Sequence, residues 1–364
     1  MKKKKTLDLA LLATVILVSL ILLVNLITRD KHVDAFSGAT PRALHKTVPD
    51  GLSLTVDGKV KQPYHFVGES FRKMAKIRIR TPEISSGGEI LGAYIYTGIP
   101  VLYIMEGVAA EKKETDVFDR PMDMVVVFTS YSGEKAYFSY GECTTADDTR
   151  PVILAYHREQ VLPSVDPGKY TRNKYRKNIA GLRLICPRDP DDSRYLDNVV
   201  RVTLLRLPTP DNLLPVMEKG KKCSSTSIEC VAGEKKWPAA YDNVPVKKVS
   251  DWFRIGHGRG IKGTTLFTAS GYHLSSFLKR NFPDCSAGDF FIFVACDGYR
   301  SLFSGSELFR TAAGDSFLLL ETMNGKPLEG GPTVGAIADF FVDRCVWGVT
   351  HVVRVKPVTF AGEG

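Results

Sequence analysis

An internal repeat is the feature of this sequence that most restricts its fold. In each half, an aspartate opens an apolar run that leads to a glycine, and a glutamate follows nine residues after that glycine. These positions are Asp123, Gly133 and Glu142 in the first half, and Asp289, Gly298 and Glu307 in the second. The two registers are offset by about 165 residues. Because self-similarity at a fixed offset is typical of duplicated units, we predict two copies of one fold.

Short apolar runs bounded by Gly, Pro and Asp dominate both halves. Examples are DMVVVFT, KAYFSY and PVILAYH in the first half, and DFFIFVACDGY and SFLLLETMNGKPL in the second. Runs of this length, rich in β-branched and aromatic residues, predict strands. Few stretches after the N-terminal region show helical spacing, and the best candidates for short helices are GIPVLYIMEGV and GYHLSSFLKRNF. The sequence therefore predicts a strand-rich α+β fold.

The N-terminus carries a long apolar stretch. Residues 9–27 are nineteen in number and follow four lysines, Lys2 to Lys5. A helix of that length is about 28 Å long, close to the thickness of the bilayer hydrocarbon core. The lysines place the N-terminus in the cytoplasm. We therefore predict one transmembrane helix in a single-pass protein of a bacterial cell membrane. The bulk of the chain is expected on the periplasmic, extracytoplasmic side. A cleaved signal peptide is the alternative.

The charge of the chain restricts its partners. The formal net charge is +9, and it falls to +6 for the exported part, once Lys2–Lys5 and Asp8 are left out. No run of Lys or Arg interleaved with aromatic residues is present, so the sequence predicts no nucleic-acid partner. An anionic cofactor or small-molecule ligand suits the mild positive excess.

The seven cysteines are odd in number and include no CxxC pair. They therefore predict neither a disulfide scaffold nor a cysteine-based zinc site, and we predict no metal ligands. Cys223 and Cys230 are close enough in the sequence to form a small disulfide in an oxidising compartment. Cys186 and Cys296, in apolar runs, are expected to be buried unpaired thiols.

Several motifs in order resemble the molybdopterin-binding domain of the sulfite oxidase family. In the first half they are VDG, YTGIPVLYIMEGV, VILAYHREQVLP and GLRLICP, and in the second ACDGYRSLFSGSELF, LLLETMNGKPLEGGP and DRCVWGVTHVVRV. The resemblance implies a tandem duplicated sulfite oxidase-like molybdopterin-binding fold behind one N-terminal transmembrane helix. The predicted parts are an anchor at 1–29, a juxtamembrane segment at 30–50, a first copy at 51–208, a linker at 209–244, a second copy at 245–357 and a tail at 358–364.

The resemblance also implies a cofactor, with one departure. Family members hold molybdenum through a pterin dithiolene and one protein cysteine, which lies on a loop before the TGIP-like turn. Neither copy has a cysteine there. The second copy instead has GHGRGIKG, where His257, Arg259 and Lys262 stand on a glycine-rich loop that suits an anion such as a pterin phosphate. A solvated basic turn is the alternative.

The stretch DAFSGAT, before the first copy, resembles the flavinylation motif of periplasmic electron-transfer subunits with FMN-binding domains. In that motif a threonine hydroxyl accepts FMN through a phosphoester, and the matching residue here is Thr40. Gly38 and Ala39 leave room for the approach of the phosphate. The resemblance implies covalent FMN at Thr40, and a plain linker is the alternative.

These observations lead to one predicted function and two alternatives. The prediction is a membrane-anchored extracytoplasmic oxidoreductase of the molybdopterin-binding type that lacks the usual cysteine ligand and works with a membrane or periplasmic electron-transfer partner. The alternatives are a non-catalytic ligand-binding or scaffold module of the same fold, and an electron-transfer protein that carries FMN.

Overall fold

The structure of the protein is a computed structural model. It describes residues 48–112, 118–145, 150–161, 176–216, 218, 227–253, 266–337, 339 and 341–356. Residues Pro49–Gly364 form one compact unit by themselves. Below, residues 49–216 of this unit are called the first half and residues 227–356 the second half.

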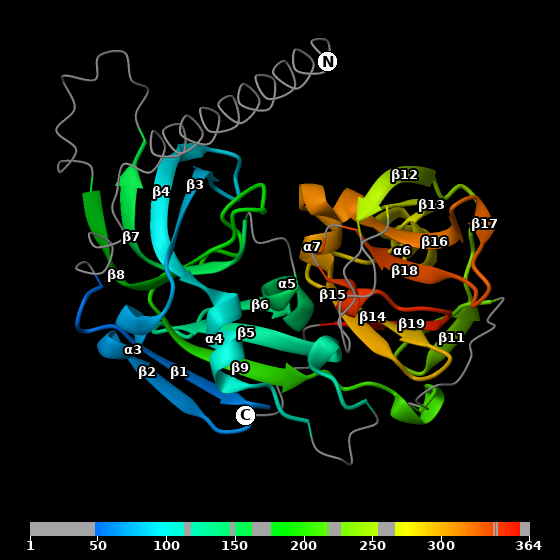
Figure 1. Cartoon of the computed structure of the whole chain (residues 1–364), viewed down its shortest axis with the longest axis horizontal. Helices are drawn as coiled ribbons and strands as arrows, with labels where there is room; N and C mark the ends of the chain where they lie inside the picture. The colour runs from blue at the N-terminus through cyan, green and yellow to red at the C-terminus, as the bar shows by residue number, and fades with distance from the viewer. Residues whose placement is uncertain are drawn as a thin grey trace, which may run out of the picture. The chain divides into compact units, whose positions relative to one another are not determined.

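The first half contains a five-stranded sheet (Figure 1). Its strands, in spatial order, are β2 (Tyr64–Val67), β1 (Ser53–Gly58), β9 (Val199–Arg206), β5 (Met124–Ser130) and β6 (Lys135–Ser139). β1 and β9 run parallel, whereas the other neighbours are antiparallel. Six of the seven residues of β5 are buried, on both faces of the strand. This sheet is therefore covered on both sides at its centre.

The second half contains a five-stranded sheet with the same strand order. Its strands are β11 (Lys235–Pro238), β10 (Glu229–Ala232), β19 (Val349–Val355), β14 (Phe290–Ala295) and β15 (Arg300–Ser304). Again the first and last strands of the half, β10 and β19, form the parallel pair. β10 and β11 lie within residues 209–244, which the sequence analysis assigns to a linker. The domain boundaries stay a prediction.

Each half also has a second, largely antiparallel sheet. In the first half it consists of β3 (Ile77–Ile84), β4 (Ile90–Pro100), β7 (Ile153–Gln160) and β8 (Arg176–Ile185). In the second half it consists of β12 (Val246–Phe253), β13 (Leu266–His273), β16 (Phe317–Met323), β17 (Lys326–Pro327) and β18 (Thr333–Ala336), which pairs with β16.

The helices of the described residues are short connections between strands. They are α3 (Gly68–Lys73), α4 (Val101–Val108), α5 (Tyr140–Thr144), α6 (Leu274–Asn281) and α7 (Gly305–Phe309), with 3-10 turns η2 (Pro121–Asp123), η5 (Asp211–Leu213), η6 (Ala312–Ser316) and η7 (Val342–Arg344). α4 and α6 confirm the two helical stretches expected from the sequence. α5 and α7 each follow directly on a hairpin, β5–β6 and β14–β15.

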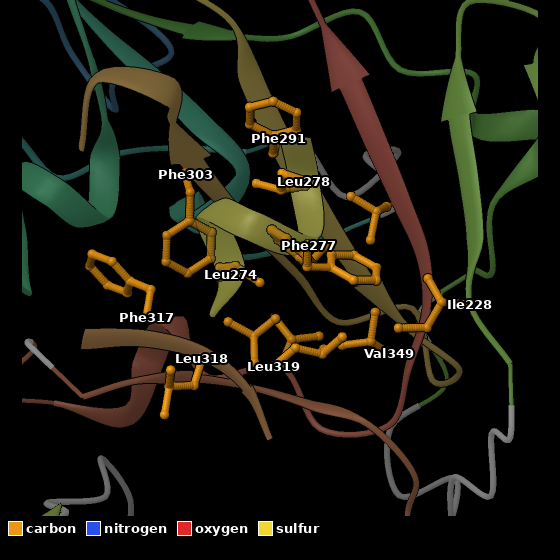
Figure 2. Packing of buried hydrophobic residues seen from close by; sticks show 14 of the residues in the cluster. Ile228, Leu274, Phe277, Leu278, Phe291, Phe303, Phe317, Leu318, Leu319 and Val349 are labelled. Carbon is orange, nitrogen blue, oxygen red and sulfur yellow. The ribbon is translucent and has the colours of Figure 1, made fainter. Parts of the chain in front are cut away.

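The core can be followed from β14, whose six residues are all buried. Successive side chains of a strand point to opposite faces. Phe291 and Phe293 therefore join the core of the second half, where Figure 2 shows Phe291 near Leu278 of α6. Phe290 and Ile292 face the other way and pack in a cluster with Val125 of β5. The two five-stranded sheets thus share a hydrophobic core, and the halves are packed against each other.

The predicted fold class is wrong. The described residues form four β-sheets joined by α-helices of at most eight residues, and these helices do not build a layer of their own, as an α+β fold requires. The apolar runs were rightly assigned to strands, but the two helical stretches were given too much weight, since each amounts to two turns.

The predicted anchor and localisation are corrected as well. Among the residues described, no helix is both long and apolar enough to cross a bilayer. The predicted span at residues 9–27 lies outside them. The single-pass membrane localisation is therefore not supported.

Candidate functional site

The residues selected from the sequence do not contribute to the described structure. His257, Arg259 and Lys262 lie in the range 254–265, and Thr40 lies before residue 48, so all four fall outside the described residues. Anion binding by the glycine-rich loop and FMN attachment at Thr40 stay predictions. In the described ranges, no group of three or more His, Cys, Asp and Glu side chains is placed to hold a metal ion.

The cysteines behave mainly as buried apolar groups. Cys186 is buried and free, as predicted, and burial raises its pKa well above the ordinary value. Cys230 is also a buried free thiol, with a pKa raised by burial to about 12, so it does not form the disulfide with Cys223 that the sequence would allow. Cys296 is disulfide-bonded rather than free. At neutral pH the thiols of Cys186 and Cys230 are protonated and offer no thiolate to a metal or a substrate.

A buried cluster of charged residues joins the two halves and begins at two helix N-termini. Ser139 caps α5 by accepting a hydrogen bond from the backbone N–H of Glu142, at 3.0 Å. Ser304 caps α7 in the same way, accepting from the N–H of Glu307 at 3.1 Å. A serine followed three residues later by a glutamate is the sequence of a capping box. These caps fix the two glutamates close to the ends of β6 and β15.

In the first half, Glu142 is paired with Arg194. The guanidinium donates from Nη1 and Nη2 to the two carboxylate oxygens, at 3.1 and 2.7 Å. Its Nε and Nη2 donate to the carboxylate of Asp189, at 2.7 and 2.6 Å. The ring of Phe138 lies 4.3 Å from the guanidinium carbon. Arg194 is therefore held by two carboxylates and one aromatic face.

The second half has the same arrangement around Arg344. Its Nε and Nη2 donate to Asp339, each at 2.6 Å, and its Nη1 donates to Glu307. The rings of Phe303 and Phe317 lie 4.9 and 5.1 Å from the guanidinium carbon. The Arg344 and Asp339 side chains have no exposed surface, so this triad is fully enclosed.

The two triads are connected by the capping serines. The hydroxyl of Ser304 donates to Oε2 of Glu142 at 3.0 Å, and the hydroxyl of Ser139 donates to Oε2 of Glu307 at 3.3 Å. Each hydroxyl thus accepts within its own half and donates to the other half, which uses both functions of the group. We call these eight residues the ionic clamp: Ser139, Glu142, Asp189, Arg194, Ser304, Glu307, Asp339 and Arg344.

The backbone of α5 packs closely against the side chains of the clamp. A side chain at Gly141 of α5 would overlap Cδ of Arg344, so this position requires glycine. The hydroxyl of Thr145, next to α5, donates to Asp339 at 3.2 Å. Both contacts cross between the halves and leave Arg344 and Asp339 no approach from solvent.

Burial and like charge raise the pKa of two clamp carboxyls, Glu307 and Asp189. Burial raises the pKa of Glu307 to about 7; Arg344 opposes the shift, and Glu142 and Asp339 add to it. Burial also raises the pKa of Asp189, with Arg194 acting against it. Burial alone would lower the pKa of Arg344, but the carboxylates of Asp339 and Glu307 raise it above its ordinary value. The clamp therefore holds cations that stay charged and one glutamate that titrates near neutrality.

Two openings among the described residues lie away from the clamp. Hollow A has a volume of about 810 Å³ and is lined by residues 208–210, 212–213, 232–235, Trp237, 281–284 and 353–356. Hollow B, of about 570 Å³, is lined by residues 58–60, Glu111 and 204–209. Pro208 and Thr209 line both. Each hollow lies where a parallel strand pair ends, β10 with β19 for hollow A and β1 with β9 for hollow B.

A molybdenum centre with a protein thiolate does not fit the described residues. In the first half, Glu83 near the end of β3 stands close to the position of the family's cysteine. The Glu83 carboxylate accepts from the Tyr96 hydroxyl at 2.6 Å and pairs with Arg183. No cysteine stands there, and the pKa of the buried Cys143 is raised well above its ordinary value. The matching loop of the second half lies outside the described residues, so molybdopterin stays a prediction from sequence.

The role of the clamp was not predicted from the sequence. Glu142 and Glu307 mark the repeat there, whereas Arg194 belongs to none of the motifs described above and Arg344 enters only as part of the motif DRCVWGVTHVVRV. In both halves, however, an aspartate stands five residues before the arginine, and the arginine stands five residues before the closing strand. Charged residues at matching offsets in both halves were the signal that could have identified the clamp.

Comparisons with known proteins identify no family. No protein-family model matches the chain. No curated protein matches it either. Among solved structures, the sulfane dehydrogenase SoxCD from Paracoccus pantotrophus is similar, with a TM-score of 0.31, 10% sequence identity and coverage of 77% of this chain. The chain covers 61% of that structure, less than two thirds of its length. A similarity of this strength carries no conclusion about function.

Proposed function

We propose that this chain is a ligand-binding module rather than a catalyst, and that hollow A is its binding site. The observation that carries the proposal is the lining of hollow A. Its described residues include Trp237, Phe282 and Leu213, but no histidine, cysteine or serine. Such groups are the commonest general bases and nucleophiles. Carboxylates and lysines can also serve in these roles, but those that line hollow A are exposed to solvent and lack the burial that usually tunes a catalytic group: Glu234, Asp284, Lys235 and Lys356.

The buried charges of the ionic clamp support the same proposal. Glu307 has a pKa suited to proton transfer, yet its carboxylate is hydrogen-bonded to Ser139 and Arg344 and is nearly enclosed. A group in that position faces no substrate. Perturbed pKa values also arise in structural ion-pair networks, and the clamp is such a network. Its role in this proposal is to fix the two halves in one arrangement.

The volume of hollow A is in the range of small-molecule sites, which measure about 300 to 1,000 Å³ and are mostly apolar. The small-molecule partner stays a prediction from the sequence, and the volume of hollow A is our reason for proposing it here. Hollow B has polar and charged side chains on its lining, Lys59, Glu111 and Arg206, and no aromatic residue. Hollow A is therefore the better candidate for an apolar ligand.

The test uses a neutral apolar probe, N-phenyl-1-naphthylamine, whose fluorescence rises in apolar surroundings. We expect saturable binding to one site of the full chain. Leu213→Glu places a charge in hollow A, from a half-buried position, and should abolish that binding. The matched control is Ile90→Glu, on β4, at a side chain that is 76% exposed. No saturable binding, or equal binding to the Leu213→Glu variant, would contradict the proposal.

A second measurement examines the catalytic alternative. Intact-mass spectrometry of the full chain and analysis of the molecules released on denaturation should show an unmodified chain and no pterin. An FMN-sized adduct on Thr40, or released molybdenum with a pterin, would overturn the non-catalytic assignment.

A further inference from the structure

The lining of hollow A has an apolar part, which we call its floor, and a group of cationic residues at one edge, which we call its corner. On the floor, the half-buried Trp237 packs edge-on against Phe282, with ring centroids 5.2 Å apart. Val353 and Val355, buried residues of β19 whose side chains point to the other face of the sheet, also line the hollow. An indole whose edge is already packed leaves part of its surface for another flat apolar group.

The cationic corner follows from strand register. Lys235 of β11 pairs with Ala232 of β10, and Ala232 pairs with Arg354 of β19. Residues directly opposite in neighbouring strands point to the same face, and strands lie about 4.8 Å apart, so these positions form one row. Lys356 stands two residues beyond Arg354 and continues the same face. Lys235 is exposed, and the Lys356 side chain is 56% exposed.

The carboxylates near this corner form ion pairs mainly with Arg354. Asp284 accepts from Arg354 at 2.5 Å and lies 3.3 Å from the Lys356 ammonium, and these two hydrogen bonds hold its pKa down, at about 2. Asp289 accepts from Nε of Arg354 at 3.0 Å. At this corner, three cations stand near three carboxylates: Lys235, Arg354 and Lys356, with Glu234, Asp284 and Asp289. Asp284 and Asp289 bind Arg354, and Asp284 also binds Lys356, whereas Lys235 forms no ion pair with a described residue. The exposed Lys235 therefore presents a positive charge at the rim, beside the Lys356 ammonium.

We propose that hollow A selects a small amphipathic anion, with a flat apolar body on the Trp237 floor and one anionic group at Lys235 and Lys356. This inference rests on the proposed function, since it names the ligand class of the same site. The apolar body supplies contact area, and the charge-assisted contacts of the lysines orient it.

The experiment compares two probes with the same rings. 8-Anilinonaphthalene-1-sulfonate carries an anionic group, and N-phenyl-1-naphthylamine lacks it. We expect the sulfonate to bind the full chain at least about tenfold more tightly, because it adds charge-assisted contacts at a partly desolvated rim. The double variant Lys235→Glu/Lys356→Glu should remove this preference, so that the sulfonate binds no more tightly than the neutral probe.

The control and the outcomes separate the two proposals. Lys326→Glu, at an exposed lysine on β17 of another sheet, should leave both affinities unchanged. Equal affinities for the two probes, or a sulfonate affinity that the double variant does not weaken, would overturn the selection for anions while leaving hollow A a binding site. Loss of specific binding of both probes would overturn the proposed function itself.

Discussion

The two triads of the ionic clamp use the same side chains but differ in burial. In the second half, the Arg344 and Asp339 side chains have no exposed surface, and Glu307 is 4% exposed. In the first half, Arg194 is 9% exposed and Glu142 8%. A recess of about 10 Å³ also borders Glu142 and Arg194, close to the smallest volume that can hold one water.

This difference shows how position alone changes the energetics of one arrangement. A charge that loses its partner can recover hydration only where water can reach it. Around Arg194, the recess gives water some access. Around Arg344, the aromatic rings of Phe303 and Phe317 and the helix α5 exclude water. The second-half triad should therefore tolerate less change than the first.

The largest effect is expected from Arg344→Met. Methionine keeps part of the aliphatic stem but leaves Glu307 and Asp339 without their cation in an enclosed site. Breaking a buried ion pair by removing one partner costs about 3 to 5 kcal/mol of unfolding free energy. Urea unfolding of the variant measures this loss. Arg201→Met is the control, since Arg201 is 56% exposed and forms a surface pair with Asp57 that is worth about 1 kcal/mol or less.

Arg194→Met should also destabilise the protein, but less. Its carboxylate partners, Glu142 and Asp189, lie beside the recess, where water can replace part of the lost interaction. We expect a loss of about 3 kcal/mol, at the lower end for a buried pair. The same urea titration gives the ranking. A loss equal to or larger than that of Arg344→Met would show that burial does not set the difference between the triads.

Much of the local structure was predictable from residue patterns. The apolar runs that became β5, β7, β14 and β16 have strand composition, and α4 and α6 stand where the helical spacing is found. Glu142 and Glu307, which mark the repeat in the sequence, also occupy equivalent positions in the structure. Each stands three residues after a serine that caps a helix. These features depend on neighbours in the chain, which a sequence displays directly.

The sheet organisation and the clamp were not predictable in the same way. Ser139 and Glu307 are 168 residues apart, and no local pattern states that a hydroxyl of one half meets a carboxylate of the other. Both faces of β14 are buried. The sequence of this strand does not tell which face packs within the second half and which packs against the first half. The short helices were misjudged because two turns with helical spacing can serve as a connection as well as part of a layer.

The pH dependence of stability offers a sharper comparison of the two glutamates. The pKa of Glu307 is raised to about 7 from an ordinary value of 4.5 by burial, with Glu142, Asp339, Arg344 and the Ser139 hydroxyl facing it. Between these values the folded state keeps a proton that the unfolded state has lost, so this contribution to stability is present at low pH and is lost as pH rises through 7.

Glu307→Gln should therefore flatten the pH profile. Between pH 5 and pH 8 we expect the wild-type protein to lose about 2 kcal/mol more unfolding free energy than the variant. Urea unfolding at several pH values measures the difference. Glu329→Gln, at an exposed glutamate, is the control and should follow the wild-type profile. Parallel profiles for Glu307→Gln and wild type would show that Glu307 does not titrate in this range.

The smallest effect concerns the serines, and it tests whether the triads act through each other. Ser139→Ala removes the cap of α5, which costs about 1 kcal/mol, and also removes the 3.3 Å contact with Glu307 of the other half.

A double-mutant cycle of Ser139→Ala with Glu307→Gln isolates the contact between halves, and residues in one hydrogen-bond network show coupling of about 0.5 kcal/mol or more. The matching cycle of Ser304→Ala with Glu142→Gln examines the 3.0 Å contact that runs the opposite way. Because the Ser139 contact ends on the more deeply enclosed glutamate, its coupling should be the larger of the two despite its greater length. Coupling near zero in both cycles would mean that each triad is stable without the serine contacts, and that the shared core of β5 and β14 and the other contacts between the halves, such as that of Thr145 with Asp339, hold the halves together.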